Sequence, residues 1–301
     1  REIQSLKKKV QSLTREIESI KAGLMEDSSL VEKMLRMRGI SVIRKNPTEH
    51  LFFPSDLSSL CKSRFYEMMK KYSFRLVLRD MIKFQDQFRI QDLTRYCSLK
   101  VVQGYCNLLC EMGMIKKIGR GKYETQVSPL YSFGPTLEWF VAEMFKKEFV
   151  SSAIYGVSVK NTPSGGDYDV IASWNQKLVY VEVKSSPPKG VEQSEISTFF
   201  SRMDDILPDM AFLYNDTQLR MKDKLVVMFE EELKSRYGKE SKTLFPVERL
   251  FEELFHIRHR VFIVNSKKDV VENFQICLRH YLRHGLEAYE PQSASCGRER
   301  F

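Results

Sequence analysis

Two short apolar runs at residues 168–172 and 178–184 lie only a few residues apart, and this pair constrains the fold more than any other feature of the chain. Runs of this length and composition favour β-strands, and so short a connection joins them as an antiparallel hairpin. If Asn175 and Gln176 form the loop, residue 174 pairs with 177, 172 with 179 and 170 with 181. The predicted register then fixes which side chains meet across the hairpin.

This register brings charged side chains together at the open end of the hairpin. Pairing continued from the turn places Asp169 directly opposite Glu182. Two carboxylates in that position destabilise a sheet, unless a divalent cation lies between their oxygens. Because side chains alternate along a strand, Lys184 shares the face of Glu182, whereas Val181 and Val183 point into the opposite layer. The sequence therefore predicts two acids and an amine on one patch of a sheet, with a metal ion between the acids.

The spacing of these residues resembles that of the PD-(D/E)XK nuclease superfamily. The resemblance rests on Asp169 and on Glu182-Val183-Lys184, with Gly165-Gly166-Asp167 before them, although the leading dipeptide is not Pro-Asp. Across residues 133–214 the sequence is similar to archaeal Holliday-junction resolvases and, with the preceding segment, to ancillary nucleases of CRISPR systems. This resemblance implies an α/β fold with a restriction endonuclease-like mixed sheet flanked by helices.

The resemblance also implies a cofactor and a reaction. Mg²⁺ or Mn²⁺ would be held by Asp169, Glu182, the Val183 carbonyl and an acid from the preceding helix, and would activate water for phosphodiester hydrolysis. Lys184 would position the nucleophile and stabilise developing negative charge. The implied function is a metal-dependent nuclease, with DNA favoured over RNA. The alternatives are a catalytically silent DNA-binding regulator and a coiled-coil interaction protein.

The acid from the preceding helix has three candidates, Glu138, Glu143 and Glu148. At 100° per residue, Glu138 falls between Phe145 and Phe149 on the apolar face, whereas Glu143 falls between Trp139 and Lys147. A carboxylate on a buried stripe is costly unless something charged compensates it. We therefore predict Glu138 as the fourth catalytic and metal-binding residue, and keep Glu148, in the last turn, as second choice.

Further polar residues lie close to the motif in sequence. Asp167 shares the face of Asp169, and either supports the site or is a plain turn residue. Gln193 and Glu195 open the next predicted helix, where related nucleases often keep an amide or an acid. Their alternative role is that of ordinary first-turn residues favoured by the helix dipole.

The segment before the motif resembles a winged helix-turn-helix. Its expected elements are a helix from Phe74, a strand at residues 88–90, helices at 91–96 and 100–112, and a hairpin over 114–123. The helix expected at 100–112, with the residue before it, should bury Leu99, Val102, Cys106 and Leu109. The residues predicted to bind nucleic acid are Lys100, Gln103, Asn107, Lys116, Lys117, Arg120 and Lys122. The alternative is a module used only for packing or dimerisation.

The amino-terminal segment carries a heptad pattern. Apolar residues recur at alternating steps of three and four, at positions 3, 6, 10, 13, 17, 20 and 24. This pattern predicts a parallel coiled coil and a homodimer, the alternative being one helix folded back on its own domain. The expected organisation is a coiled-coil helix at 1–28, a helical linker at 29–72, the winged helix at 73–127, the nuclease domain at 128–288 and a disordered tail at 289–301.

Composition limits the partners and the compartment. Lys and Arg number 48 against 39 Asp and Glu, and the resulting charge of +9 suits a polyanionic partner. No apolar run approaches the roughly 20 residues of a membrane span, so no membrane partner is expected. Six cysteines without paired spacing predict reduced thiols and a cytoplasmic setting.

The carboxyl-terminal part holds two pairs of histidines. His256 precedes His259 closely, and His280 and His284 are four residues apart in a predicted helix. Such pairs can bind a transition metal, but neither has an Asp, Glu or Cys at a familiar spacing to complete a ligand set. We therefore predict surface histidines. A further helix is expected over residues 247–255.

Overall fold

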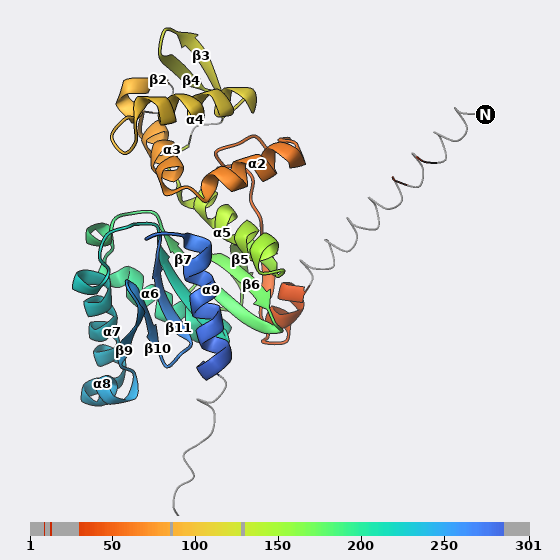
Figure 1. The fold of residues 1–301 in the computed structure, drawn as a ribbon. Helices are drawn as coiled ribbons and strands as arrows, with labels where there is room; N and C mark the ends of the chain where they lie inside the picture. Colours follow the sequence, from red (N-terminus) through yellow and green to blue (C-terminus); the bar gives the residue numbers. More distant parts are fainter. Residues whose placement is uncertain (1–8, 10–12, 14–29, 85–86, 128–129, 286–301) are drawn as a thin grey trace, which may run out of the picture.

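The computed structural model describes residues 9, 13, 30–84, 87–127 and 130–285 (Figure 1). The predicted coiled coil at 1–28, residues 9 and 13 excepted, and the tail predicted from residue 289 lie outside the described residues. None of the helices in the described part combines the length and the apolar character needed to cross a membrane.

A large mixed sheet forms the centre of the molecule. Within the described residues it has eight strands in the order β1-β5-β6-β7-β8-β11-β10-β9. The strands are β1 (Ser41–Arg44), β5 (Ser152–Lys160), β6 (Asp167–Trp174), β7 (Lys177–Lys184), β8 (Met210–Asn215), β9 (Val247–Phe251), β10 (Leu254–Ile257) and β11 (Val261–Asn265). The β7–β8 and β8–β11 pairs are parallel and the other pairs antiparallel. The predicted mixed α/β sheet is confirmed.

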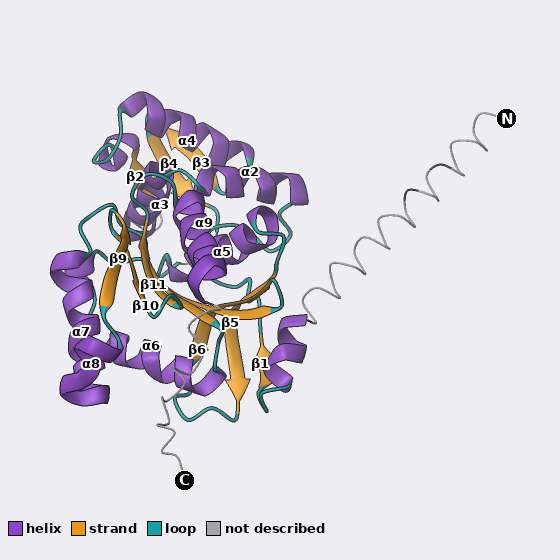
Figure 2. Cartoon of the chain, turned by 60° about the horizontal axis from the view of Figure 1, so that its bottom comes forward, coloured by secondary structure: helices purple, strands orange, loops and turns teal. Residues whose placement is uncertain are grey.

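Helices cover both faces of this sheet (Figure 2). One face carries α5 (Gly134–Glu148) and α9 (Val270–His280), and the other carries α6 (Gln193–Ile206) and α7 (Val227–Tyr237). Strand β7 shows how the sequence divides between the layers. Val181 and Val183 pack with the α5 and α9 layer, while Tyr180 packs with the α6 and α7 layer. The predicted direction of these two valines is confirmed.

Shorter helical segments complete the large domain. They are residues 30–36, α8 (Ser241–Leu244), η2 (Pro188–Gly190), η3 (Lys222–Val226), η4 (Gly238–Glu240) and η5 (Tyr281–Gly285). The helix predicted over residues 247–255 is wrong, because this segment forms β9, a turn with Glu252 at φ 46°, and β10. Pairing of β10 with β11 extends the sheet, and a helix there would leave the edge of β11 unpaired.

A smaller helical and β module precedes α5. It consists of α2 (Ser59–Met69), α3 (Tyr72–Phe84), β2 (Gln87–Arg89), η1 (Ile90–Leu93), α4 (Leu99–Glu111), β3 (Ile115–Gly119) and β4 (Lys122–Thr125). Its strands pair antiparallel in the order β2-β4-β3, which confirms the predicted hairpin. Figure 1 shows the small sheet at the end of the molecule remote from α7 and α8.

Two details of this module differ from the prediction. The helix expected at residues 91–96 is only the 3-10 turn η1, because Asp92 accepts a hydrogen bond from the Arg89 amide and the Thr94 hydroxyl bonds back to the Gln91 carbonyl. Such local bonds offer the backbone an alternative to a helix. Leu99 is 51% exposed because it is the first residue of α4, and the predicted burial of this side chain is wrong.

The two parts of the chain are joined by a buried ionic cluster. Arg75 of α3 donates hydrogen bonds of 2.8 to 3.0 Å to the Asp216 carboxylate just after β8, and Arg79 also pairs with it. Burial acts to raise the pKa of Asp216, but the two guanidinium groups outweigh burial and lower that pKa to about 2. One continuous apolar cluster also runs from α2 and α3 into α5 and α9, so the module and the large sheet share a core.

Candidate active site

The predicted register of the β6–β7 hairpin is confirmed. Residue 174 pairs with 177, 172 with 179 and 170 with 181. Asp169 and Glu182 therefore occupy the next opposed positions, immediately beyond the last ladder pair. The Val183 amide donates a hydrogen bond of 2.7 Å to Asp169 Oδ2, so the carboxylate lies against the backbone of β7.

The alternation of side chains breaks at Asp169. Tyr168 packs in the layer of α6 while Val170 packs in the layer of α5, although residues two apart on a regular strand share a face. The neighbouring strand β5 is irregular beside it, where Gly156 has φ +53° and a Cβ would lie 2.6 Å from Pro47 Cγ. A glycine inside a strand often marks such an irregularity or a close backbone approach. The break places Asp169 where elements from both faces of the sheet can reach it.

Glu182 is almost completely buried, at 2% exposure, and is surrounded by donors. Lys184 Nζ lies 2.9 Å from one of its carboxylate oxygens, and Arg202 Nη1 donates a 2.9 Å hydrogen bond to the other, which also accepts from the Tyr180 hydroxyl. Lys184 forms a second ion pair with Glu195 Oε1, at 2.8 Å. The prediction that Glu182 and Lys184 share a face is confirmed.

Glu138 approaches this cluster from α5. Burial raises the pKa of its carboxyl group to about 7, with further contributions from the negative charges of Glu182 and Asp167, while Arg202 and Lys184 oppose the rise. A Cβ built on Gly156 would lie 3.8 Å from Glu138 Oε2, which places this carboxylate beside the irregular segment of β5.

The other two acids of α5 are engaged elsewhere. Glu148 accepts a 2.8 Å hydrogen bond from Tyr66 and forms a 2.7 Å ion pair with Lys70, and Glu143 pairs with Lys146 at 3.1 Å. The helical phase therefore ranked the three candidates correctly as to position, because Glu138 is the one whose electrostatic partners are the acids of β6 and β7.

The electrostatics of the cluster suit a bound cation. Burial raises the pKa of Asp169 well above its ordinary value, and Glu182 and Glu138 raise it further, against the Val183 hydrogen bond and Lys184. Three carboxylates that repel one another supply hard oxygen ligands, the donor class preferred by Mg²⁺ and Mn²⁺. The donor type present is therefore the one that these ions prefer.

The residues predicted to support the site divide into three outcomes. Asp167 is exposed and accepts a 3.1 Å hydrogen bond from Arg44. Its negative charge influences the cluster by helping to raise the pKa of Glu138. Glu195 holds Lys184. The placement of Gln193 near the site is wrong, because its side-chain amide donates to the Met228 carbonyl of α7 at 3.0 Å. Gln193 and Glu195 are about 200° apart around the helix, so both cannot face one site.

Two residues of the cluster were missed in the sequence. Arg202 follows Glu195 by seven residues on α6, and this two-turn spacing places both on one helix face. Tyr180 precedes Glu182 by two residues on β7 and shares its face. Strand alternation could have found Tyr180 once Glu182 was chosen, whereas Arg202 reaches Glu182 only because α6 packs on β7.

The residues predicted to bind nucleic acid belong to α4, β3, β4 and the turn between these two strands, away from the elements that carry the acids. Those with exposed side chains are Lys100, Asn107, Lys116, Lys117, Arg120 and Lys122. Gln103 instead donates to Asn107 Oδ1 at 2.8 Å and to the Tyr123 hydroxyl at 2.9 Å. Lys117 pairs across the hairpin with Tyr123 and Lys116 with Glu124, so these two lysines lie on opposite faces of the small sheet.

The two histidine pairs do not form separate surface groups. His256 is 4% exposed, and the rings of both pairs meet between β10 and the end of α9. The prediction of surface histidines is wrong for His256. The turn after β10 and the end of α9 are brought together by the sheet, which sequence spacing does not show.

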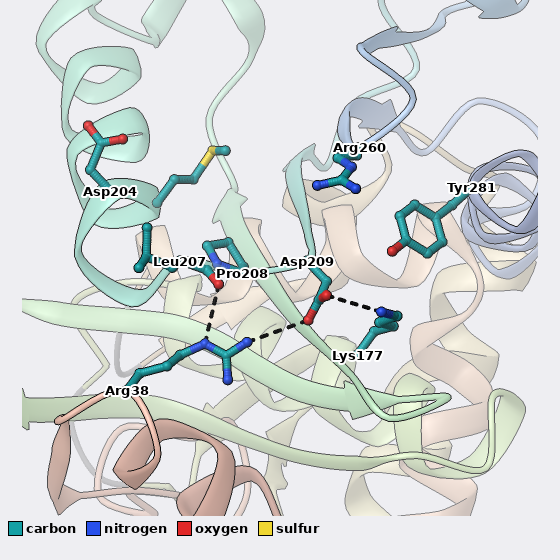
Figure 3. Close-up of a pocket in the computed structure, with 9 residues that line it drawn as sticks. Arg38, Lys177, Asp204, Leu207, Pro208, Asp209, Arg260 and Tyr281 are labelled. Carbon is teal, nitrogen blue, oxygen red and sulfur yellow. Dashed lines mark hydrogen bonds and ion pairs between the residues drawn. The ribbon is translucent and has the colours of Figure 1, made fainter. Parts of the chain in front are cut away.

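A cavity of about 720 Å³ lies at the other end of β7 (Figure 3). In its lining Asp209 lies between Arg38 at 3.5 Å and Lys177 at 3.4 Å. Lys177 begins β7 and Lys184 ends it, so this cavity is separate from the acidic cluster.

Comparisons with known proteins found distant structural likeness only. No protein-family model and no curated protein matches the sequence. Protein VC1899 from Vibrio cholerae aligns with a TM-score of 0.42 and 15% identity, over 71% of this chain and 59% of its own. Can2 from Sulfobacillus thermosulfidooxidans, solved in complex with cyclic tetra-adenylate, aligns with a TM-score of 0.47 and 12% identity, over 84% of this chain and 60% of its own. This chain thus spans about three fifths of each structure, and likeness at this level carries no inference about function.

Proposed function

We propose that this chain is a metal-dependent nuclease that hydrolyses phosphodiester bonds. The observation that carries the proposal is the meeting of acids from α5, β6 and β7 beside the partly buried Lys184 amine. A merely structural cluster has no need of mutually repelling carboxylates, since burying them raises their free energy. Perturbed acids next to a fixed cationic side chain are typical of catalytic centres.

Asp169, Glu182, Glu138 and the Val183 carbonyl would hold the ion, which is Mg²⁺ or Mn²⁺ in this proposal. When bound, such an ion lowers the pKa of water and neutralises charge on the scissile phosphate. The Val183 amide fixes the orientation of the Asp169 carboxylate through its 2.7 Å hydrogen bond.

Lys184 is the proposed cationic group for the transition state. Burial acts to lower the pKa of its amine, but the ion pairs with Glu182 and Glu195 outweigh burial and raise that pKa. The amine therefore stays charged at neutral pH, where it can orient a water molecule and stabilise negative charge on the phosphate. Glu195 and Arg202 act as positioning residues, because each holds a member of the cluster and not a reacting atom.

The small module supplies the proposed nucleic-acid surface. The order of α3, η1, α4 and the β3–β4 hairpin supports a winged helix-turn-helix, and its exposed basic side chains suit phosphate contacts. Such modules bind duplex DNA by inserting the second helix into the major groove, so DNA is the preferred substrate in this proposal.

The experiment is cleavage of plasmid DNA, single-stranded DNA and RNA by the purified chain, with Mg²⁺, with Mn²⁺ or with EDTA. We expect cleavage of DNA with either ion, none with EDTA, and none by Glu182→Gln in any condition. Glu143→Gln is the control, because it makes the same chemical change at an acid that pairs with Lys146 and lies outside the cluster. Cleavage that persists in EDTA, or in Glu182→Gln at the wild-type rate, would show that this site is not the catalytic centre.

A further inference from the structure

Four of the five histidines gather in one place, far apart in sequence but adjacent in the fold. His256 lies on β10, His259 in the turn before β11, His280 at the end of α9 and His284 in η5. The centroid of the His280 ring is 4.5 Å from that of His256, 4.9 Å from that of His259 and 4.8 Å from that of His284. The ring of His284 is also 5.4 Å from that of His259.

Three of the four rings bring ligand atoms near one another. One ring nitrogen from each of His256, His259 and His280 lies within 4.8 Å of the other two. Nδ1 of His259 is 2.8 Å from Nε2 of His280. Around a tetrahedral zinc ion with Zn–N bonds of about 2.0 Å, ligand nitrogens are about 3.3 Å apart. The His259–His280 pair is slightly closer than that value, so small ring movements would let these nitrogens share one ion.

One nitrogen of the buried His256 ring has no hydrogen-bond partner among the described residues. Its Nδ1 atom is buried and has no hydrogen bond in the described structure. Buried polar atoms are nearly always satisfied, so such an atom calls for an explanation.

The spacing of the histidines in the chain resembles that of structural zinc sites, in which cysteines commonly form the closer pair. The first two ligands come from a β-hairpin with two residues between them, and the last two come from a helical segment with three between them. Structural zinc sites commonly combine a close pair of ligands with a second pair three to five residues apart. Arg258 and His259 also have positive φ, at 51° and 59°, in a turn where asparagine or glycine is usual.

We propose that His256, His259, His280 and His284 form a binding site for a divalent transition-metal ion such as Zn²⁺. Four imidazoles are borderline donors that suit zinc, copper or nickel and not Mg²⁺, so this site is chemically distinct from the carboxylate cluster on β6 and β7. Four protein ligands close the coordination shell, which makes the ion structural. It ties the end of α9 and η5 to the β10–β11 hairpin. Glu248, with Oε2 3.8 Å from His256 Nε2, is placed to orient that ring.

The test uses the untagged full chain, stripped with a chelator, dialysed and titrated with ZnCl₂ by calorimetry in excess Mg²⁺. We expect one zinc ion per chain, and Co²⁺ in its place should give the intense visible absorption of a tetrahedral complex. His280→Ala should lower zinc affinity at least 100-fold. His284→Ala, an exposed substitution that leaves the core intact, should lower it at least tenfold.

Two matched controls separate this site from other sources of binding. His50→Ala alters the remaining histidine, which is exposed and belongs to another part of the fold, and should bind zinc as the wild type does. Glu182→Gln should also keep its zinc, so failure of the proposed nuclease activity does not affect this result. The proposal is overturned if the wild type binds less than about half an ion per chain, or if folded His280→Ala and His284→Ala both bind as tightly as the wild type.

Discussion

Replacing Glu138 by glutamine should stabilise the metal-free protein at alkaline pH and change its stability little at acidic pH. The carboxyl group of Glu138 lies among other acids, and its pKa rises from an ordinary 4.5 to about 7 because of burial and the charges of Glu182 and Asp167. Its ionised form is therefore disfavoured in the folded chain. Glutamine has nearly the same shape and cannot ionise.

The size of the effect follows from the two pKa values. One pKa unit corresponds to about 1.36 kcal/mol, so the rise in the pKa of Glu138 destabilises the folded chain with Glu138 ionised by up to about 3 kcal/mol. Below pH 4.5 the folded and unfolded chains are both protonated at Glu138. Between pH 4.5 and 7 the folded chain keeps a proton that the unfolded chain has released, so stability falls as pH rises. Above this window the full cost is present.

The assay is urea unfolding in EDTA, at about pH 4.5 and about pH 8, where linkage sets the size of each difference. Glu138→Gln should exceed the wild type by up to about 3 kcal/mol at the higher pH and by less than about 1 kcal/mol at the lower. Glu143→Gln, the control on the same helix, should change stability by less than about 0.5 kcal/mol. Equal effects of Glu138→Gln at both pH values, or destabilisation at the higher one, would refute the proposed electrostatics.

Four other predictions concern catalysis, binding and assembly. Asp169→Ala should abolish both Mn²⁺ binding and cleavage, measured by calorimetry and a nuclease assay, and wild-type cleavage would contradict its role. Lys184→Ala should keep the ion but lose most turnover, since the amine serves the transition state; loss of ion binding instead would contradict this. Charge removal at Lys116 and Lys117 should weaken DNA binding and flatten its salt dependence by about one unit of slope for each phosphate that is no longer neutralised, and an unchanged slope would indicate a packing module. Deleting residues 1–25 should halve the mass measured by light scattering, and an unchanged mass would disprove the predicted coiled-coil dimer.

Local pattern was enough to determine the centre of the candidate site. Period-two alternation and a two-residue loop fixed the β6–β7 register, and with it the opposition of Asp169 and Glu182 and the side of Lys184. Helical phase likewise selected Glu138, since angular position around a helix depends only on residue number. These features are properties of one strand pair and one helix.

Features that depend on contacts between distant segments could be found only in the tertiary structure. Arg202 reaches Glu182 because α6 packs on the face of β7 that carries this acid, and no local pattern specifies that packing. The segment at residues 247–255 became two strands, because pairing of β10 with β11 and of β9 with β10 satisfies backbone groups that helical propensity alone does not weigh.

The histidines show the same limit most clearly. His256 and His280 are separated by a turn, a strand and most of a helix, and each pair alone resembles a solvated surface group. Parallel pairing of β11 with β8 and packing of α9 against that sheet bring them within 4.5 Å, measured between ring centroids. Sequence spacing determines which side chains share a face of one helix or strand. Burial and contacts between distant ligands depend instead on how the helices and strands pack, and the whole core decides that packing.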